Sequence, residues 1–264
     1  MRRKPDNRAR ARSAKKISGA LSAATPCDIV FQTIAADCLA ELQSCSEGAK
    51  HGNADAVHRM RVSLTRLQTA IRFFSPVLDR RWTVHCHRAL VGLRKLLGSA
   101  RDADIAIERG HPKGERQKLW QNVRQRKYHE LRRVIGSKTY KGLVATFTRP
   151  TATKHTSRTS AFSGAVSFSR FASERLDAWK QKLLRSSRGL KTLGLHKIHR
   201  VRVKSKRLRY ALEWSLSIAT GQEFRNMKKV LKSVNRIQRD LGDLADARTH
   251  RDYAKPKDWC LSQG

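Results

Sequence analysis

The sequence is poor in acidic residues: it has 21 Asp and Glu against 57 Lys and Arg in 264 residues, a formal net charge of +36. No run approaches the 18 or more apolar residues of a membrane-spanning helix, so we expect a soluble protein without a membrane-spanning segment. A charge excess of this size opposes a compact fold by self-repulsion unless anions bind to it. We therefore expect a polyanion as partner, and nucleic acid, an acidic membrane surface and a phosphate polymer are the classes to consider.

Cysteine is also scarce, and the five that occur are scattered without a Cys-x-x-Cys pair. An odd, dispersed set in a chain of this length is typical of reduced thiols, which indicates a cytoplasmic protein. Cys86 lies between His85 and His87, a pattern that a metal site can use. No second group of ligands stands at a usable spacing, so we expect neither a metal nor another cofactor.

Strand signals are few, because Val, Ile and Thr seldom alternate with polar residues and no Asn-Gly or Asp-Gly hairpin turn occurs. Apolar residues instead recur at helical spacing from Cys27 onward, which predicts an all-α chain. Pro76 marks the end of one helix, since the residue before a proline disfavours the helical conformation. The expected helices cover about 29–42, 55–74, 80–97, 100–109 and 114–135, and helical patterning resumes from about 169 to 253 with breaks near 189–194 and 221.

Two segments lack helical patterning. Residues 1–26 form a basic arm that we expect to be disordered, although its Arg-rich, acid-poor composition is also that of a transit peptide. No acidic residue lies between Glu130 and Glu174, and the middle of this stretch is rich in Thr and Ser. The predicted organisation is a basic arm (1–26), a first helical half (27–147), a connector (148–168), a second helical half (169–254) and a tail (255–264).

The two helical halves resemble each other. Residues 58–70 read HRMRVSLTRLQTA and residues 199–211 read HRVRVKSKRLRYA, with seven of thirteen positions identical. Farther along, LGSARDADI (97–105) matches LGDLADART (241–249) through Leu-Gly and a later Asp-Ala. Two matches in the same order indicate a tandem duplication, and we expect two pseudo-symmetric helical bundles.

Each repeat predicts a helix with one apolar face and one cationic face. At about 100° per residue, an apolar stripe forms from Met60, Leu64, Leu67, Ile71 and Phe74, and in the second repeat from Val201, Leu208 and Leu212. The other side carries His58, Arg61, Thr65, Gln68 and Arg72, and then His199, Arg202, Lys206 and Arg209, with Arg207 beside them in the place of Arg66. We expect the apolar face to pack in the bundle and the polar face to display a column of cations.

A solvated face is the ordinary explanation of such a column. Residues 197–209, however, hold seven Lys and Arg and no carboxylate, so helical ion pairs are not their purpose. If a two-fold axis relates the halves, the two columns face each other across a shared cleft, which favours an anion-binding site. There a neutral imidazole donates one hydrogen bond to a phosphate oxygen and an arginine fork reaches two, while nearby phosphates raise the histidine pKa.

At these residues the sequence resembles the CHAD family, the conserved histidine α-helical domain. Its signature, His-x-x-Arg followed by a basic Arg/Lys-Arg-Leu-Arg run, is matched at 58–68 and again at 199–209. The Leu-Gly-x-x-Arg-Asp-x-Asp element matches 97–104, with a counterpart at 241–246. The resemblance covers about residues 28–253. It implies two four-helix bundles around a basic central channel that binds inorganic polyphosphate, often in or near polyphosphate granules.

Carried over residue by residue, the resemblance implies the ligands His58, Arg61, Arg66, His199, Arg202, Lys206, Arg207 and Arg209, and the predicted site also includes Arg72 and Arg101. The sequence leaves two roles open for Arg101, which could bind a ligand or cap a helix end. Thr65 and Gln68 stand where the first repeat of the family is usually basic, so this half is expected to bind less strongly. Asp102 and Asp104 are expected to satisfy helix ends or arginines.

The predicted function is non-catalytic binding of inorganic polyphosphate, with the protein in the cytoplasm or at polyphosphate granules. A flexible polymer without bases needs no stacking aromatics, and aromatic residues make up only 6% of the chain. The alternative is a basic helical protein that binds nucleic acid, at least nonspecifically, although no zinc-finger, RRM or KH signature occurs. Catalysis is not expected, because the Glu-x-Glu-x-Lys strand of the triphosphate-tunnel hydrolases is absent. The oligomeric state stays open.

Overall fold

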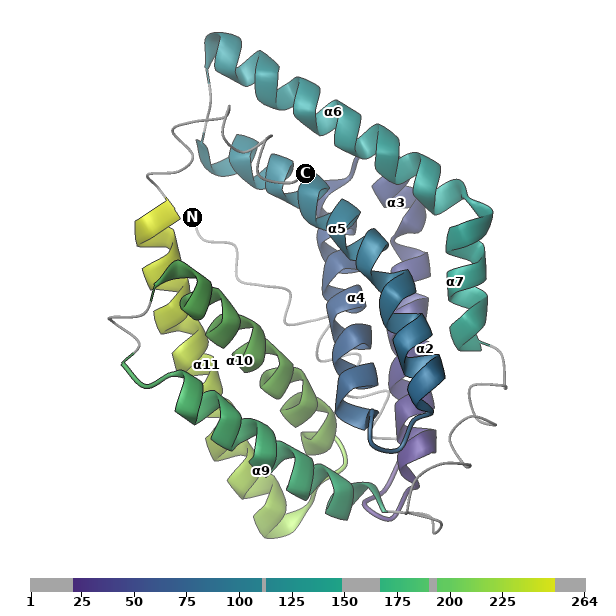
Figure 1. Cartoon of the computed structure of the whole chain (residues 1–264), viewed down its shortest axis with the longest axis vertical. Helices are drawn as coiled ribbons and strands as arrows, with labels where there is room; N and C mark the ends of the chain where they lie inside the picture. The colour runs from purple at the N-terminus through teal and green to yellow at the C-terminus, as the bar shows by residue number, and fades with distance from the viewer. Residues whose placement is uncertain (1–20, 111–112, 149–166, 190–193, 250–264) are drawn as a thin grey trace.

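The computed structural model describes residues 21–110, 113–148, 167–189 and 194–249. Most of the predicted basic arm, nearly all of the predicted connector and the tail lie outside these residues. Within the described ranges the regular structure is helical, apart from one isolated bridge between Pro26 and Ser167. The prediction of an all-α protein is therefore confirmed (Figure 1). No helix in these ranges is long and apolar enough to cross a membrane.

The ends of the helices follow from local chemistry. Asn53 caps one of them by accepting a hydrogen bond from the Ala56 amide at 2.9 Å. Gly221 adopts a φ of 56° where another begins, a conformation that favours glycine. In chain order the helices are α2 (Cys27–Ser44), α3 (Ser46–Lys50), α4 (Ala54–Phe74), α5 (Arg80–Gly110), α6 (Gly114–Gly136), α7 (Lys138–Thr148), α9 (Phe168–Ser186), α10 (Leu195–Leu216) and α11 (Gly221–Thr249).

One predicted helix break is absent. The sequence predicted separate helices over 80–97 and 100–109, whereas α5 continues through Gly98. A glycine inside a helix costs about 1 kcal/mol relative to alanine. Leu97 and Ala100 on either side of it are fully buried, and the packing of this face outweighs that cost. Helix α7 also lies beyond the helices that the sequence predicted.

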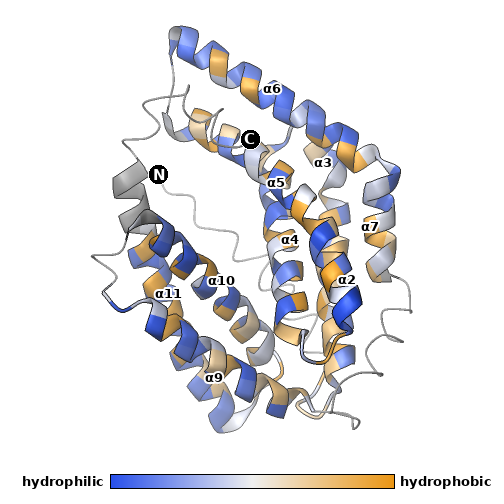
Figure 2. Cartoon of the chain, viewed as in Figure 1, coloured by the Kyte–Doolittle hydropathy of each residue, from blue (hydrophilic) through white to orange (hydrophobic). Residues whose placement is uncertain are grey.

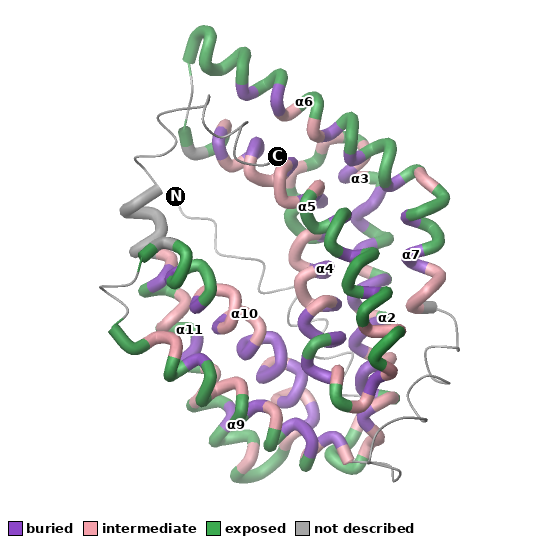
Figure 3. The backbone as a smooth tube through the Cα atoms, in the orientation of Figure 1, coloured by how far each residue is buried: buried purple, intermediate pink, exposed green. Residues whose placement is uncertain are grey.

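The apolar stripes of the two repeated helices are confirmed. Met60, Leu64, Leu67, Ile71 and Phe74 of α4 are at most 2% exposed, and Val201, Leu208 and Leu212 of α10 are each 1% exposed. Each helix thus buries one side and keeps the other polar, as the change of colour across α4 and α10 indicates in Figures 2 and 3. The buried stripe fixes the rotation of each helix about its axis, and so fixes where its cations lie.

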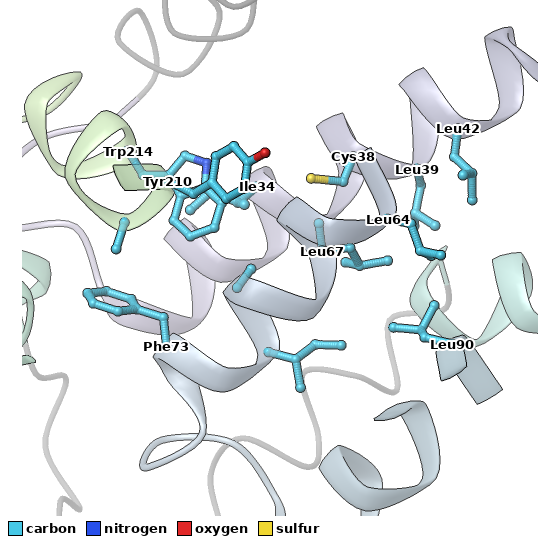
Figure 4. Close-up of a cluster of buried hydrophobic side chains, with 14 of the residues drawn as sticks. Ile34, Cys38, Leu39, Leu42, Leu64, Leu67, Phe73, Leu90, Tyr210 and Trp214 are labelled. Atoms are coloured by element: carbon cyan, nitrogen blue, oxygen red, sulfur yellow. The ribbon is translucent and has the colours of Figure 1, made fainter. Parts of the chain in front are cut away.

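The larger of two hydrophobic clusters in the described parts of the chain joins both halves. Helices α2 and α4 contribute Ile34 and Leu67, and α10 contributes Tyr210 and Trp214 to the same cluster (Figure 4). The rings of Tyr210 and Trp214 are stacked, with centroids 6.5 Å apart. The helix α10 is therefore anchored against the first half of the chain by large buried side chains.

Aromatic rings also join the end of α4 to α9. The Phe73 ring lies 5.6 Å from that of Phe171 and 5.3 Å from that of Trp179, both edge-on. Edge-to-face pairs at this separation stabilise a core beyond the area that they bury. The Phe168 amide at the start of α9 also donates to the Thr25 carbonyl before α2, at 3.0 Å. The two halves are thus fastened together at this end of the molecule.

The prediction of two pseudo-symmetric four-helix bundles is not confirmed. The first half contributes α2 to α7, the described part of the second half contributes α9 to α11, and both share one core (Figure 1). The repeated segments do lie on corresponding helices: the first match lies on α4 and α10, and the second on α5 and α11.

Candidate anion-binding site

Helix α4 presents one polar column away from its buried stripe. His58 and Arg72 are exposed, while Arg61, Thr65 and Gln68 are partly buried. The Thr65 hydroxyl donates to the Arg61 carbonyl at 2.8 Å, so it is engaged by its own helix. The column therefore offers the cations Arg61 and Arg72, with His58 at its N-terminal end.

Helix α10 presents the second column. Arg202, Lys206 and Arg207 are partly buried on it, and His199 is exposed one turn before them. Helices α4 and α10 pack against each other, so these cations lie near the junction of the two halves rather than on a remote surface. Water is partly excluded there, which strengthens every electrostatic interaction that they make.

Lys206 reveals that the two columns face each other. The pKa of its ammonium group is lowered to about 8, first by burial and then by the positive charges of Arg202, Arg61 and Arg209. Arg61 belongs to α4, so part of this repulsion comes from the opposite column. The sequence analysis expected the two columns to face each other if a two-fold axis related the halves, and the effect of Arg61 on Lys206 places one cation of each column near the other.

Arg94 of α5 adds a third source of charge. The pKa of Arg207 is lowered to about 10, first by burial and then by the charges of Arg72 and Arg94. Arg72 lies at the C-terminal end of α4, whereas Arg94 lies in the middle of α5. Cations from three helices therefore act on one another around α10.

His199 lies within the same field. Its pKa is lowered by burial and then by the charges of Arg202, Lys206 and Arg94, with a smaller effect of His196. Both effects disfavour the protonated imidazole, and a neutral imidazole donates one hydrogen bond. The sequence predicted a raised histidine pKa in the presence of phosphate, and that prediction concerns the loaded site.

We refer to this set of residues as the cationic seam: Arg61, Arg72, Arg94, His199, Arg202, Lys206 and Arg207. In the described parts of the chain, the only salt bridge of the seam joins Arg61 Nη1 to Asp102 Oδ1 at 3.9 Å. Seven basic side chains, four of them partly buried, thus have one carboxylate among them, and their mutual repulsion raises the free energy of the folded state. A bound anion removes this cost, so the arrangement favours anion binding.

Sequence reasoning missed Arg94. The repeat gave no signal for it, because the offset of 144 that relates α5 to α11 places Gln238 at the equivalent position. A helical wheel for α5 could have found it. With Cys86, Leu90 and Leu93 buried, Arg94 falls at the edge of the buried stripe, where a side chain reaches a neighbouring helix.

Three predicted ligands have other surroundings. Arg101 is 16% exposed and its Nη1 lies 3.2 Å from Glu108 Oε1, so it serves a salt bridge within α5. Arg209 is buried, with its Nη1 3.7 Å from Glu213 Oε1. Arg66 is partly buried, and its positive charge acts on the thiol of Cys38 in α2. These arginines support the packing around the seam more than they line it.

Asp104 has the structural role that the sequence predicted. Its carboxylate is buried and accepts hydrogen bonds from Arg124 Nε at 2.9 Å and from the Tyr128 hydroxyl at 2.8 Å. Arg124 also donates to the Gly52 carbonyl at 2.6 Å. The network connects α5, α6 and the turn before α4. Asp102, the other carboxylate of the motif, is paired with Arg61 as described above.

No group of three His, Cys, Asp or Glu side chains among the described residues is arranged to hold a metal ion. Cys86, which the sequence places between two histidines, is fully buried, whereas His85 and His87 are exposed. Burial raises the pKa of the Cys86 thiol to about 12, so the thiolate that a metal would need is disfavoured.

Comparison with known proteins shows the family and the fold of this chain. The family model of the CHAD domain matches residues 33–255. A crystal structure of the CHAD domain from the plant Ricinus communis superimposes with a TM-score of 0.71 at 22% sequence identity, covering 92% of this chain and 88% of that one. A search of curated proteins gives no match. Since the family model spans most of the chain, and the fold agrees, this protein belongs to the CHAD domain family.

Proposed function

We propose that this protein binds inorganic polyphosphate at the cationic seam and does not hydrolyse it. One observation carries the proposal: Lys206 and Arg207 are partly buried beside further cations of α4, α5 and α10. Burial first, and then the positive charges of these neighbours, lower the pKa of both side chains. A chain of phosphates supplies one negative charge after another, and Arg and Lys are the side chains that bind phosphate oxygens best.

The surroundings of the seam favour a polymer without bases. Single-stranded nucleic acids are usually held by exposed aromatic rings on which the bases stack. Tyr210, the aromatic residue closest in sequence to the second column, is only 4% exposed and stacks on Trp214. It is therefore not available to a base. Polyphosphate needs no such surface, because its only recognisable features are charge and oxygen acceptors.

The carboxylates beside the seam also support binding without catalysis. Enzymatic phosphoryl transfer uses carboxylates that hold metal ions or position a nucleophile. Asp104 is already occupied by Arg124 and Tyr128, and Asp102 faces Arg61. We propose that both aspartates serve the structure. Release of orthophosphate from polyphosphate by the pure protein with Mg²⁺ would contradict this part of the proposal.

The proposal is tested by titrating the protein with polyphosphates of increasing length at ~150 mM salt, where loose surface charge is strongly screened. The variant carries Arg202→Glu and Arg207→Glu. Each new carboxylate lies among cations, so the fold should tolerate it. We expect affinity to fall at least about tenfold, since two charge-assisted contacts are lost.

The matched control carries Arg126→Glu and Arg133→Glu, which make the same change of charge on exposed positions of α6. That helix packs against α3, α5 and α7. Equal losses in both variants would mean that charge acts diffusely, and the proposed site would be wrong. Displacement of polyphosphate by duplex DNA at equal phosphate concentration would instead favour nucleic acid as the partner. Association with polyphosphate granules in the cytoplasm is a further part of the proposal, tested by locating the same two variants in cells.

A further inference from the structure

The outer face of α11 carries a second line of cations that the seam does not use. Its members recur three or four residues apart and are all exposed: Arg225, Lys229, Lys232, Arg236 and Arg239. We refer to them as the outer stripe. Met227, Val234 and Leu241 of the same helix are buried, and α11 packs against α10. At about 100° and 1.5 Å per residue, the outer stripe lies opposite this buried side and is ~21 Å long. Figure 3 marks exposed positions of α11 in green.

Exposed lysines and arginines are ordinary on a helix, where carboxylates one turn away usually pair with them. Some cations of other helices follow that rule, with salt bridges at Glu47–Lys50, Glu115–Lys118, Lys127–Glu130 and Arg170–Glu174. Others, such as Arg126 and Arg133 of α6, are exposed without a salt bridge in the described parts of the chain, so the outer stripe differs by having five such cations in one line. In the described parts of the chain no salt bridge includes a member of the outer stripe.

The two carboxylates described on α11 do not change this contrast. Glu223 accepts a hydrogen bond from the Ser169 hydroxyl of α9, at 3.3 Å to Oε2. Asp240 follows Arg236 by four residues, yet no salt bridge joins them, and Arg225 Nε donates to the neutral Gln222 Oε1 at 2.8 Å. Like charges one turn apart cost a helix a few tenths of a kcal/mol per pair, so an uncompensated stripe is unfavourable unless an anion covers it.

The stripe also recurs in the first repeat. The offset of 144 between the repeats relates it to Arg81, His85, Arg88, Gly92 and Lys95 of α5, all of them exposed. The pattern is weaker there, because a histidine and a glycine replace two of the cations. Recurrence at the same register indicates that the line of charge belongs to the duplicated unit and is strengthened on α11.

We propose that the outer stripe of α11 is a second polyphosphate-binding surface, separate from the seam, which engages the part of a long chain that the seam does not hold. This inference rests on the proposed function. A flexible chain of phosphates can follow a straight line of cations. None of the five positions of the stripe is aromatic, and the exposed ring beside it, Phe224, lies at the N-terminal end of α11, where Lys228 Nζ is 5.7 Å from the ring centroid. A single ring at one end is not a row on which successive bases stack. The apolar side of α11 is buried against α10, so the helix is not free to insert into a lipid surface.

The test compares tripolyphosphate with long-chain polyphosphate. The outer variant carries Lys229→Gln, Lys232→Gln and Arg236→Gln, and a control carries Lys118→Gln, Arg126→Gln and Arg133→Gln on α6. We expect the outer variant to bind tripolyphosphate as the unaltered protein does and to bind long chains about tenfold more weakly. The control should lose much less. Circular dichroism and the melting temperature verify that all variants fold, which their exposed positions favour.

Each outcome decides between the two proposals. If the outer variant and the control bind long chains equally, the outer stripe is a solvated face and the inference is wrong. If the outer variant binds duplex DNA more weakly but binds long-chain polyphosphate with unchanged affinity, the stripe is a nucleic-acid-binding surface and the inference is equally wrong. If the Arg202→Glu, Arg207→Glu variant binds polyphosphate with unchanged affinity while the outer variant binds long chains more weakly, the outer stripe is a binding surface and the proposal for the seam is wrong. Absence of any polyphosphate binding contradicts both.

Discussion

The guanidinium of Arg175 on α9 closes the C-terminal end of α4. Its Nε donates to the Phe73 carbonyl at 3.2 Å, and its Nη2 donates to the Arg72 carbonyl at 3.1 Å. The last carbonyls of a helix lack partners within it, and a cation beside them also complements the helix dipole. Since the side chain of Arg72 belongs to the seam, this contact connects the junction of the two halves to the position of the candidate site.

We predict that Arg175→Met destabilises the protein by about 2 kcal/mol, because two hydrogen bonds from a charged donor are lost. The Phe73 carbonyl loses the Arg175 donor, whereas the Arg72 carbonyl keeps the Ser75 hydroxyl at 3.0 Å. The free energy of unfolding in urea measures the change. Arg170→Met on the same helix is the control, since Arg170 is 80% exposed and pairs with Glu174 at 3.4 Å. It should cost less than about 0.5 kcal/mol. Equal effects of the two substitutions would show that Arg175 does not fasten α4 to α9.

A substitution of Asp102 should test the seam by strengthening polyphosphate binding, whereas the substitutions of Arg202 and Arg207 should weaken it. Its Oδ1 lies 3.9 Å from Arg61 Nη1, and both side chains are partly exposed. A carboxylate at this point competes with a phosphate for Arg61. We predict that Asp102→Asn strengthens polyphosphate binding by about two- to fivefold, the value of one exposed ion pair, as measured by titration at physiological salt.

The effect must depend on Arg61. In an Arg61→Gln background, Asp102→Asn should strengthen binding less, because the competing pair no longer exists. Asp177→Asn, an exposed change of the same charge on α9, controls for net charge. A gain from Asp177→Asn as large as that from Asp102→Asn would assign the effect to overall charge and not to this pair.

The apolar stripe of α4 could be predicted because a buried helical face imposes a period of about 3.6 residues on the sequence. Met60, Leu64 and Leu67 follow this period and are at most 1% exposed. The continuity of α5 could not be predicted in the same way. Gly98 opposes a helix locally, and the burial of Leu97 and Ala100 that overrides it depends on neighbours distant in sequence.

Only the seam residues that lie within the repeated segments could be predicted from the sequence. Arg61 and Arg202 match each other across the duplication, as do Gln68 and Arg209. Yet Arg209 is buried beside Glu213, with its guanidinium 4.7 Å from the centroid of the Tyr210 ring. This burial depends on how α10 packs in the folded protein, which no local pattern encodes. Arg94 was missed for the complementary reason: its role depends on the distance between α5 and α10.

The network around Asp104 should contribute to the stability of the fold and not to the affinity for polyphosphate. Removing one partner of a buried charged pair leaves the other without compensation. We predict that Asp104→Ala destabilises the protein by about 3 kcal/mol, since Arg124 and Tyr128 both lose their acceptor. Glu115→Ala, which removes the exposed partner of Lys118, should change stability by less than about 0.5 kcal/mol. Polyphosphate affinity per folded molecule should stay unchanged in both, and a selective loss with Asp104→Ala would place Asp104 in the site.

Lys206 predicts how stability depends on pH. Its pKa in the folded protein is lowered to about 8, whereas the pKa of a lysine in an unfolded chain is about 10.4. Below pH 8 both states carry the proton, and the folded state bears the full cost of a charge that is partly buried among arginines. Between these two values the unfolded state binds more protons than the folded state, so the free energy of unfolding rises with pH.

The substitution Lys206→Met isolates this effect. At pH 7 the variant should be more stable than the unaltered protein, because it lacks the repelled charge, and the difference should shrink as the pH approaches 10. Arg126→Met at an exposed position of α6 controls for the removal of one positive charge. Saturating polyphosphate should abolish the pH dependence assigned to Lys206, since bound phosphates raise its pKa toward the unfolded value. A difference between Lys206→Met and the unaltered protein that is constant from pH 7 to 10 would mean that Lys206 keeps an ordinary pKa, and the electrostatic basis of the seam would be lost.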